Sequence, residues 1–138
     1  MNTAYPVVDK IVAKIRGFGR GGVFTSADLR GLGSRPASDK ALSRLVRQGV
    51  IRRLASGLYH YPRINPKLGG IVNPIPDAVA RAIARKTDSH IIPSGAVAAN
   101  VLGLSTQVPA KAIYLTDGPP RKVRYGSQTI IFRYAAPR

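Results

Sequence analysis

The N-terminal stretch of the chain carries an apolar stripe with the period of an α-helix. Apolar side chains recur at the spacing of one helix face, at Val7, Val8, Ile11, Val12 and Ile15. Pro6 suits the first turn of a helix, and Gly17 suits its end. This pattern predicts an amphipathic helix that buries its apolar face against another element.

Capping signals predict two further helices in the same region. The four residues that begin at Thr25 match a capping box, so a short helix should start there and stop by Gly31 or Gly33. Ser34 is suited to cap a third helix, and Gly49 is suited to end it. The chain is therefore expected to place three helices one after another.

The chain changes to β-forming residues after the third predicted helix. Residues 50–54 and 58–62 are rich in such side chains and flank a turn that contains glycine, which predicts a β-hairpin. The stretch 63–75 contains prolines and two adjacent glycines, so it is predicted to be an irregular linker. Three helices and a hairpin in this order predict a winged helix-turn-helix in residues 1–62. In that fold the third helix enters the major groove, and the hairpin lies along the DNA backbone.

A second small domain is predicted in residues 76–138. Periodicity and capping indicate two helices, at 77–86 and from Ser94 to Leu102. Alternation and turn residues indicate strands at 110–116, 121–125 and 128–134. Gly126 comes first in the two-residue loop between the last two strands, which favours a type II′ turn. The predicted fold class is α+β, with an N-terminal winged helix-turn-helix followed by a small α+β lobe.

The charge balance indicates a polyanionic partner. The 138 residues include 22 Lys and Arg against 6 acidic residues, all of them Asp, for a net charge of +16. Fifteen of the basic residues are Arg, whose planar guanidinium suits phosphate and guanine better than the ammonium of Lys does. We therefore expect nucleic acid, rather than a membrane surface, as the partner.

The third predicted helix supplies the candidate DNA-reading face. Its apolar residues share one side, which leaves a basic and polar side opposite the core. Together with the hairpin and the Gly-rich turn at 17–22, this helix gives nine candidate DNA contacts: Arg16, Arg20, Arg35, Lys40, Ser43, Arg44, Arg47, Arg52 and Arg53. Tyr59 or His60 of the hairpin is also expected to touch the sugar-phosphate backbone.

Patterns typical of catalysis or metal binding do not occur in the sequence. The chain contains no Cys, and neither His60 nor His90 has a second His or a Glu four residues away. Ser94 lacks the flanking glycines of a nucleophile elbow. We therefore expect no enzyme activity, no cofactor and no metal. No apolar run approaches the ~20 residues that span a bilayer, and the N-terminus does not read as a secretion signal, so a cytoplasmic location is expected.

A resemblance to a known family rests on three segments: residues 14–25, residues 41–53 with 57–59, and residues 93–110 with 114–118. They are similar to the AbiEi-type antitoxin family of bacterial type IV toxin–antitoxin and abortive-infection systems. The resemblance implies a winged helix that represses its own operon and a C-terminal lobe that counters a nucleotidyltransferase-like toxin encoded beside it. Partner contacts are then expected from polar side chains of the third segment, Ser94, Asn100, Ser105, Thr106 and Gln107.

Two other functions fit part of the same pattern. The protein could be a DNA-binding regulator without a toxin partner, or a basic RNA-binding protein. The RNA-binding alternative agrees with the charge. However, the sequence lacks the aromatic stacking pattern of an RNA recognition motif, and that alternative leaves the order of three helices and a hairpin unexplained.

Overall fold

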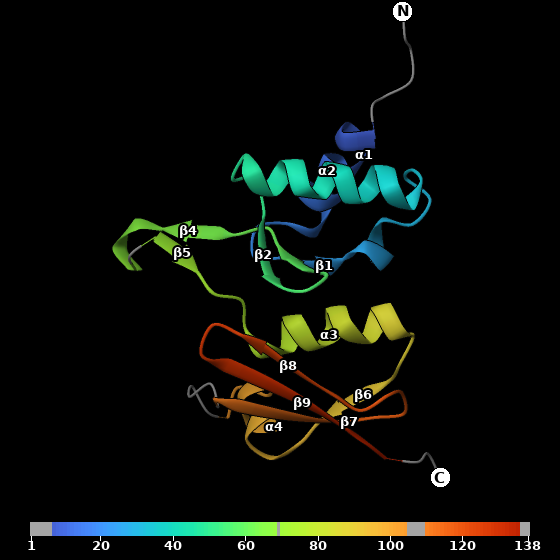
Figure 1. Cartoon of the computed structure of the whole chain (residues 1–138). Coiled ribbons are helices and arrows are strands. Elements are labelled where there is room, and N and C mark those ends of the chain that lie inside the picture. The colour runs from blue at the N-terminus through green and yellow to red at the C-terminus, as the bar shows by residue number, and fades with distance from the viewer. Residues whose placement is uncertain (1–6, 69, 105–109, 136–138) are drawn as a thin grey trace, which may run out of the picture. The chain divides into compact units, whose positions relative to one another are not determined.

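The computed structural model describes residues 7–68, 70–104 and 110–135 of an α+β protein (Figure 1). The chain divides into two compact units, Met1–Pro74 and Ile75–Arg138, called unit 1 and unit 2 below. The sheets of the described residues have the strand orders β1-β3-β2, β4-β5 and β6-β7-β9-β8. Within the same residues, no helix combines the length and apolar character needed to cross a membrane.

Unit 1 begins with two helices that pack over a small antiparallel sheet. Its elements before residue 62 are α1 (Val7–Phe18), β1 (Val23–Thr25), the 3-10 helix η1 (Ser26–Leu29), α2 (Arg35–Arg47), β2 (Arg52–Ala55) and β3 (Leu58–His60). Their buried side chains form one core: Ile11, Ile15, Phe24, Leu29, Ala41, Leu42, Leu45, Ile51 and Tyr59. The apolar stripes of α1 and α2 meet in this core, as their periodicity predicts.

The second predicted helix is shorter and tighter than expected. The capping box is present, because Thr25 N donates to Asp28 Oδ2 at 3.1 Å and Ala27 N donates to Thr25 Oγ1 at 3.2 Å. It opens only a single 3-10 turn, which ends in extended backbone at Arg30 and is followed by Gly31 at a φ of +86°. A left-handed glycine ends a helix, so the turn has no room to lengthen.

The prediction of an irregular linker is wrong for most of its length. Residues 63–72 form a β-hairpin, here called the ribbon, from β4 (Arg63–Asn65), the 3-10 turn η2 (Pro66–Leu68) and β5 (Gly70–Val72). The ribbon is antiparallel, with Ile64 opposite Ile71. Pro66 follows β4 and so takes no place in the ladder, which is where proline is tolerated. The division between the units falls after the ribbon, at Pro74.

Unit 2 is built on a mixed four-stranded sheet. Its elements are α3 (Pro76–Thr87), β6 (Ile91–Pro93), α4 (Gly95–Val101), β7 (Lys111–Thr116), β8 (Arg121–Tyr125) and β9 (Gln128–Tyr134). The prediction of two helices and of strands β7, β8 and β9 is confirmed, whereas the short edge strand β6 was not predicted. β7 and β9 pair in parallel, and the other two pairings are antiparallel.

One face of this sheet carries the core of unit 2. Ala112, Tyr114, Ile130 and Phe132 alternate onto that face and are buried together with the inward side of α3. The Tyr114 hydroxyl donates to Asp77 Oδ1 at 2.8 Å, which fixes the start of α3 over the sheet. Burial and the neighbouring Asp77 raise the pKa of Tyr114 well above its usual value. Gly126 has a φ of +56°, and Ser127 has no positive φ, as the predicted type II′ turn requires.

Candidate nucleic-acid interface

Local sequence sets both ends of α2. Ser34 Oγ accepts a hydrogen bond from Ala37 N at 3.2 Å, as expected for an N-cap. At the other end, Gly49 has a φ of +77°, and Val50 N donates back to Leu45 O at 3.0 Å. This left-handed cap turns the chain directly from α2 into β2.

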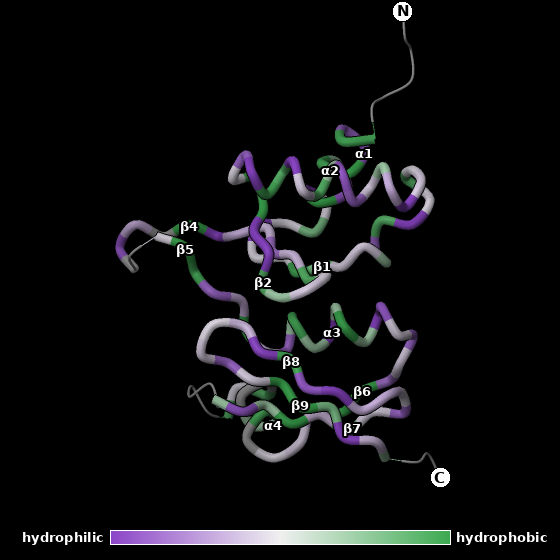
Figure 2. The backbone as a smooth tube through the Cα atoms, viewed as in Figure 1, coloured by the Kyte–Doolittle hydropathy of each residue, from purple (hydrophilic) through white to green (hydrophobic). Residues whose placement is uncertain are grey.

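The two sides of α2 differ in burial as the periodicity predicts. Ser38, Ala41, Leu42 and Leu45 are buried on the side that faces α1 and the sheet. The opposite side, called the basic stripe below, is exposed and consists of Lys40, Ser43, Arg44 and Arg47. Figure 2 shows hydrophobic and hydrophilic positions alternating along this helix. Because the core fixes the helix, the charged side is held outward.

A hollow of about 460 Å³ lies beside the basic stripe. Val7 and Val8 of α1 and two alanines of α2 contribute its apolar lining, and its charged lining consists of Lys40, Arg44 and Arg47. Sequence reasoning missed this hollow, because the N-terminal end of α1 is brought to α2 only by helix packing. The hollow leaves the three long basic side chains open space on one side of the helix.

Arg35 in the first turn of α2 is exposed and lies near an acidic neighbour. Its Nε is 3.4 Å from Asp39 Oδ1, and both side chains are more than half exposed. Exposed ion pairs of this kind contribute about 0–1 kcal/mol, so the pairing does not compete strongly with a phosphate.

The hairpin β2–β3 places its two arginines differently. Arg53 is exposed and lies over the Tyr59 ring, with its guanidinium carbon 5.6 Å from the ring centroid. Arg52 is half-buried, and its guanidinium is held by two hydrogen bonds. It donates to His60 Nδ1 at 3.1 Å and to Asn73 Oδ1 at 2.6 Å. Of the two, Arg53 is the more exposed.

The expectation that Tyr59 or His60 touches DNA is wrong. β3 is the central strand of its sheet and is covered on both faces, so Tyr59 is only 6 % exposed and His60 is 0 % exposed. Burial first, and then the positive charge of Arg52, lower the pKa of His60 to about 4. His60 is therefore neutral near pH 7, and its Nε2 has no hydrogen-bond partner among the described residues.

Arg16 precedes the Gly-rich turn, Arg20 lies within it, and both are exposed. Arg20 stacks over the Tyr61 ring, with 4.4 Å from guanidinium carbon to ring centroid, and donates to Pro62 O at 3.2 Å. The turn itself is hydrogen-bonded to the end of the hairpin, because Gly21 N donates to Tyr61 O at 2.7 Å. The Gly-rich turn, Arg20 and the end of the hairpin thus form one surface.

Of the five candidate partner residues of unit 2, the structure describes two, Ser94 and Asn100. Ser94 Oγ donates to Ile113 O at 2.8 Å, so this hydroxyl joins the start of α4 to β7. Asn100 belongs to α4. The other three candidates, Ser105, Thr106 and Gln107, lie outside the described residues.

The second face of the unit 2 sheet is a surface that sequence reasoning missed. Strand alternation places on this face the apolar residues Ile92 and Leu115 and the basic residues Lys122, Arg124 and Arg133, all exposed. The registers align Ile92 with Leu115 and Leu115 with Arg133. The period-two pattern was visible in the sequence, but strand order alone brings these five residues to one face.

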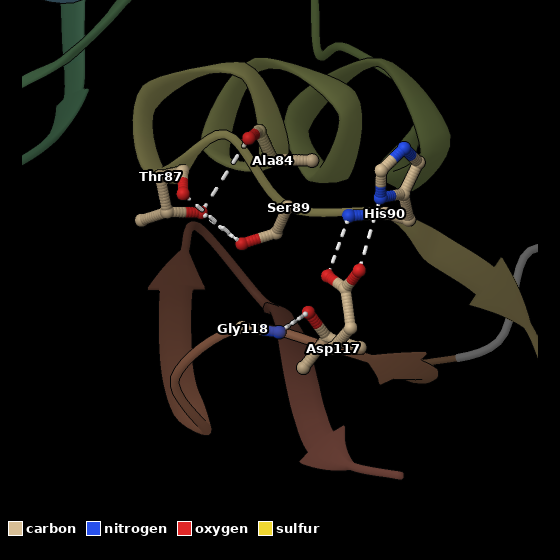
Figure 3. Close-up of polar contacts among 7 residues, drawn as sticks. Ala84, Thr87, Ser89, His90, Asp117 and Gly118 are labelled. Carbon is tan, nitrogen blue, oxygen red and sulfur yellow. Dashed lines mark hydrogen bonds and ion pairs between the residues drawn. The ribbon is translucent and has the colours of Figure 1, made fainter. Parts of the chain in front are cut away.

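A polar cluster joins the ends of β6 and β7 (Figure 3). Asp117 accepts hydrogen bonds from His90 N at 2.8 Å and pairs with His90 Nδ1 at 2.9 Å, and these contacts lower the pKa of Asp117. The Ser89 hydroxyl bonds to Thr87 Oγ1 at 2.7 Å and points away from the imidazole, so Ser89, His90 and Asp117 do not form a nucleophile relay. In the part of the chain that the structure describes, no three potential metal ligands cluster.

These features define a small α+β protein with an outward-facing basic helix. The chain belongs to DUF6088, a family of unknown function whose model matches residues 10–138. The matched range includes α2, both hairpins of unit 1 and all the described elements of unit 2. No curated protein and no solved structure matches the chain.

Proposed function

We propose that the protein is a DNA-binding transcriptional regulator whose unit 1 acts as a winged helix-turn-helix. In this proposal α2 is the recognition helix, and β2–β3 is the wing. The observation that carries it is the basic stripe of α2, which is exposed while the opposite side of the same helix is buried. Arg44 and Arg47 are positioned to read base edges, and Arg53 is positioned to contact a phosphate.

Helix geometry favours duplex DNA over RNA as the ligand. α2 has 13 residues and is about 20 Å long, a size that the wide major groove of B-DNA admits. The major groove of A-form RNA is too narrow for side chains to read. Single-stranded RNA is usually held on exposed aromatic rings, but Phe24 and Tyr59 on the sheet of unit 1 are buried.

We also propose that the protein represses its own operon and counters a nucleotidyltransferase-like toxin encoded beside it. The resemblance to AbiEi-type antitoxins suggests this role, and unit 2 supplies a separate folded body for it. The exposed residues on the second face of the unit 2 sheet include apolar and basic side chains, a composition that suits contact with a protein carrying acidic groups. A regulator without a toxin partner is the alternative.

The first test is a binding titration of the full chain with three probes. These are the duplex upstream of its own reading frame, an unrelated duplex and a structured RNA, each titrated at several salt concentrations. We expect the upstream duplex to bind most tightly, with a log–log salt slope of about −0.9 for each phosphate contacted. An affinity independent of salt, or a preference for the RNA, would contradict the proposal.

The second test distinguishes a regulator that is also an antitoxin from a regulator without a toxin partner. The neighbouring nucleotidyltransferase-like reading frame is induced with and without the full chain, and growth is followed. Rescue by a variant that no longer binds DNA would support direct antitoxicity. DNA binding without any rescue would leave a regulator that has no toxin partner.

A further inference from the structure

The ribbon presents an apolar pair to solvent. Ile64 and Ile71 lie directly opposite each other on β4 and β5, so both side chains stand on the same face of the ribbon. Their exposed fractions are 61 % and 50 %. Figure 1 shows the ribbon projecting away from the helices of unit 1. Unit 1 therefore leaves this pair without a core of its own to cover it.

The base of the ribbon is held to the hairpin β2–β3. Arg52, on β2, donates to Asn73 Oδ1 at 2.6 Å, and Asn73 directly follows β5. The buried His60 accepts a hydrogen bond from the Nε atom of the same Arg52 at 3.1 Å. This chain of contacts gives the half-buried arginine a structural purpose, because it ties the position of the ribbon to that of β2–β3.

The charge around the ribbon continues that of the basic stripe. From residue 40 to residue 76 the chain contains seven Lys and Arg and no acidic residue. Arg63 and Lys67 of the ribbon belong to this run and are exposed. A second copy of the ribbon would bring like charges together, whereas a polyanion would be attracted to them.

We propose that the ribbon is a second DNA-binding arm, which places Ile64 and Ile71 in the minor groove and bends the duplex. This inference rests on the proposed function of α2. Two-stranded ribbons are among the elements that proteins insert into DNA grooves. Minor-groove proteins insert apolar side chains between base steps, which kinks the duplex, and flanking basic residues contact the phosphates. The ribbon supplies both kinds of side chain.

The test uses the full chain and a duplex of about 20 base pairs, roughly 70 Å long, from upstream of its own reading frame, with a donor and an acceptor dye at its two ends. Affinity and end-to-end energy transfer are measured together. The variant Ile64→Thr/Ile71→Thr keeps β-branched residues in both strands and removes the apolar pair. Ile75→Thr is the matched control, since Ile75 is 58 % exposed and lies outside both the ribbon and the sheet of unit 2.

We expect wild type and Ile75→Thr to raise the energy transfer equally. The double variant should bind about tenfold more weakly and leave the energy transfer at the value of the free duplex. Netropsin, a small minor-groove ligand, should reduce the bending by wild type to the level of the double variant. Arg63→Ala leaves the isoleucines intact and should lower the salt slope by about 1.

Three results would overturn the proposal. If the double variant binds and bends the duplex as wild type does, the ribbon is not a DNA-binding arm, and the proposed function of α2 is unaffected. If the double variant changes only the oligomeric state of the protein in solution, and neither affinity nor bending, the ribbon is a contact between copies of the chain. If wild type binds no duplex at all, the proposed function fails and the arm fails with it.

Discussion

The two units carry positive charge on surfaces of different shape. Unit 1 has 13 Lys and Arg against 3 Asp, and unit 2 has 9 against 3. In unit 1 three of these basic residues, Lys40, Arg44 and Arg47, follow one side of a 13-residue helix whose other side is core. In unit 2, Lys122, Arg124 and Arg133 lie on a sheet face beside exposed Ile92 and Leu115.

This difference shows why net charge alone does not identify a DNA-binding surface. Both units would attract a polyanion, because long-range attraction depends on the summed charge. A single helix can enter the major groove, whereas a four-stranded sheet is too broad to do so. The convex basic helix of unit 1 thus suits duplex DNA, and the mixed apolar and basic sheet of unit 2 suits a protein.

The largest effect on stability should come from replacing a large buried side chain with alanine in either core. Leu42 on α2 and Ile130 on β9 are both 0 % exposed. Replacing either with Ala should lower the free energy of unfolding by about 2–5 kcal/mol, through lost burial and a residual cavity. Hydrogen exchange followed by mass spectrometry checks the localisation. Leu42→Ala should raise exchange in unit 1 and Ile130→Ala in unit 2, and a global increase from both would show that the units fold as one.

The next largest effect should come from acidic pH, which should lower the stability of the two units over different pH ranges. The pKa of His60 is about 4 in the folded protein and about 6.5 in the unfolded chain, so the unfolded state binds more protons between these values. Unit 1 should keep its full stability above pH 6.5 and lose about 3 kcal/mol as the pH falls to 4. His60→Gln, which cannot titrate, should remove this loss.

Unit 2 offers the contrast to that titration. The pKa of Asp117 is lowered from 3.8, mainly by the hydrogen bond from the His90 backbone. The ionised Asp117 therefore stabilises unit 2 above pH 3.8, and this stabilisation is lost as the pH falls through the lowered pKa. Urea titrations followed by resonances of each unit would report the two windows. Parallel losses in both units between pH 6.5 and 4 would contradict the assignment to His60.

The smallest effect should come from single charges on the two surfaces. Arg44→Ala or Arg47→Ala should each cost about 1–3 kcal/mol on the upstream duplex and little on an unrelated one, if they read bases. Arg53→Ala should weaken both duplexes alike. Lys122→Ala and Arg124→Ala remove the same charge from unit 2 and should change DNA affinity within about twofold. If these control variants lose as much DNA affinity as Arg44→Ala does, DNA binding depends on charge alone, and the different shapes of the two surfaces have no effect on it.

Local sequence was sufficient to predict most helices and the division of α2 into two faces. Ser34 and Gly49 fix its ends through hydrogen bonds and backbone conformations that involve only near neighbours. Its apolar period of 3.6 residues fixes which side is buried, whatever covers it. The strands of unit 2 from 111 to 134 were predicted for a similar reason, since alternation and the Gly126 turn are local signals.

Predictions failed where distant segments decide the outcome. β3 is the central strand of its sheet because β1, more than 30 residues earlier, pairs with one of its edges and β2 pairs with the other. Long-range packing buries Tyr59 in the core of unit 1 and His60 beside Arg52, although alternation alone would place the two side chains on opposite faces of the strand. The ribbon was missed because its prolines and glycines resemble a linker, although Pro66 and Pro74 both lie outside the paired strands.

The sequence by itself determined the charge, the helix caps and the basic side of α2, because each depends on composition or on residues within one or two turns. Only the tertiary structure decided which arginines reach the surface. Arg52 and Arg53 are adjacent in sequence, yet Arg52 is half-buried and hydrogen-bonded to His60 and Asn73, and Arg53 remains exposed. The physical reason is that strand pairing and long-range hydrogen bonds choose a side chain's surroundings, and neither is encoded by its immediate neighbours.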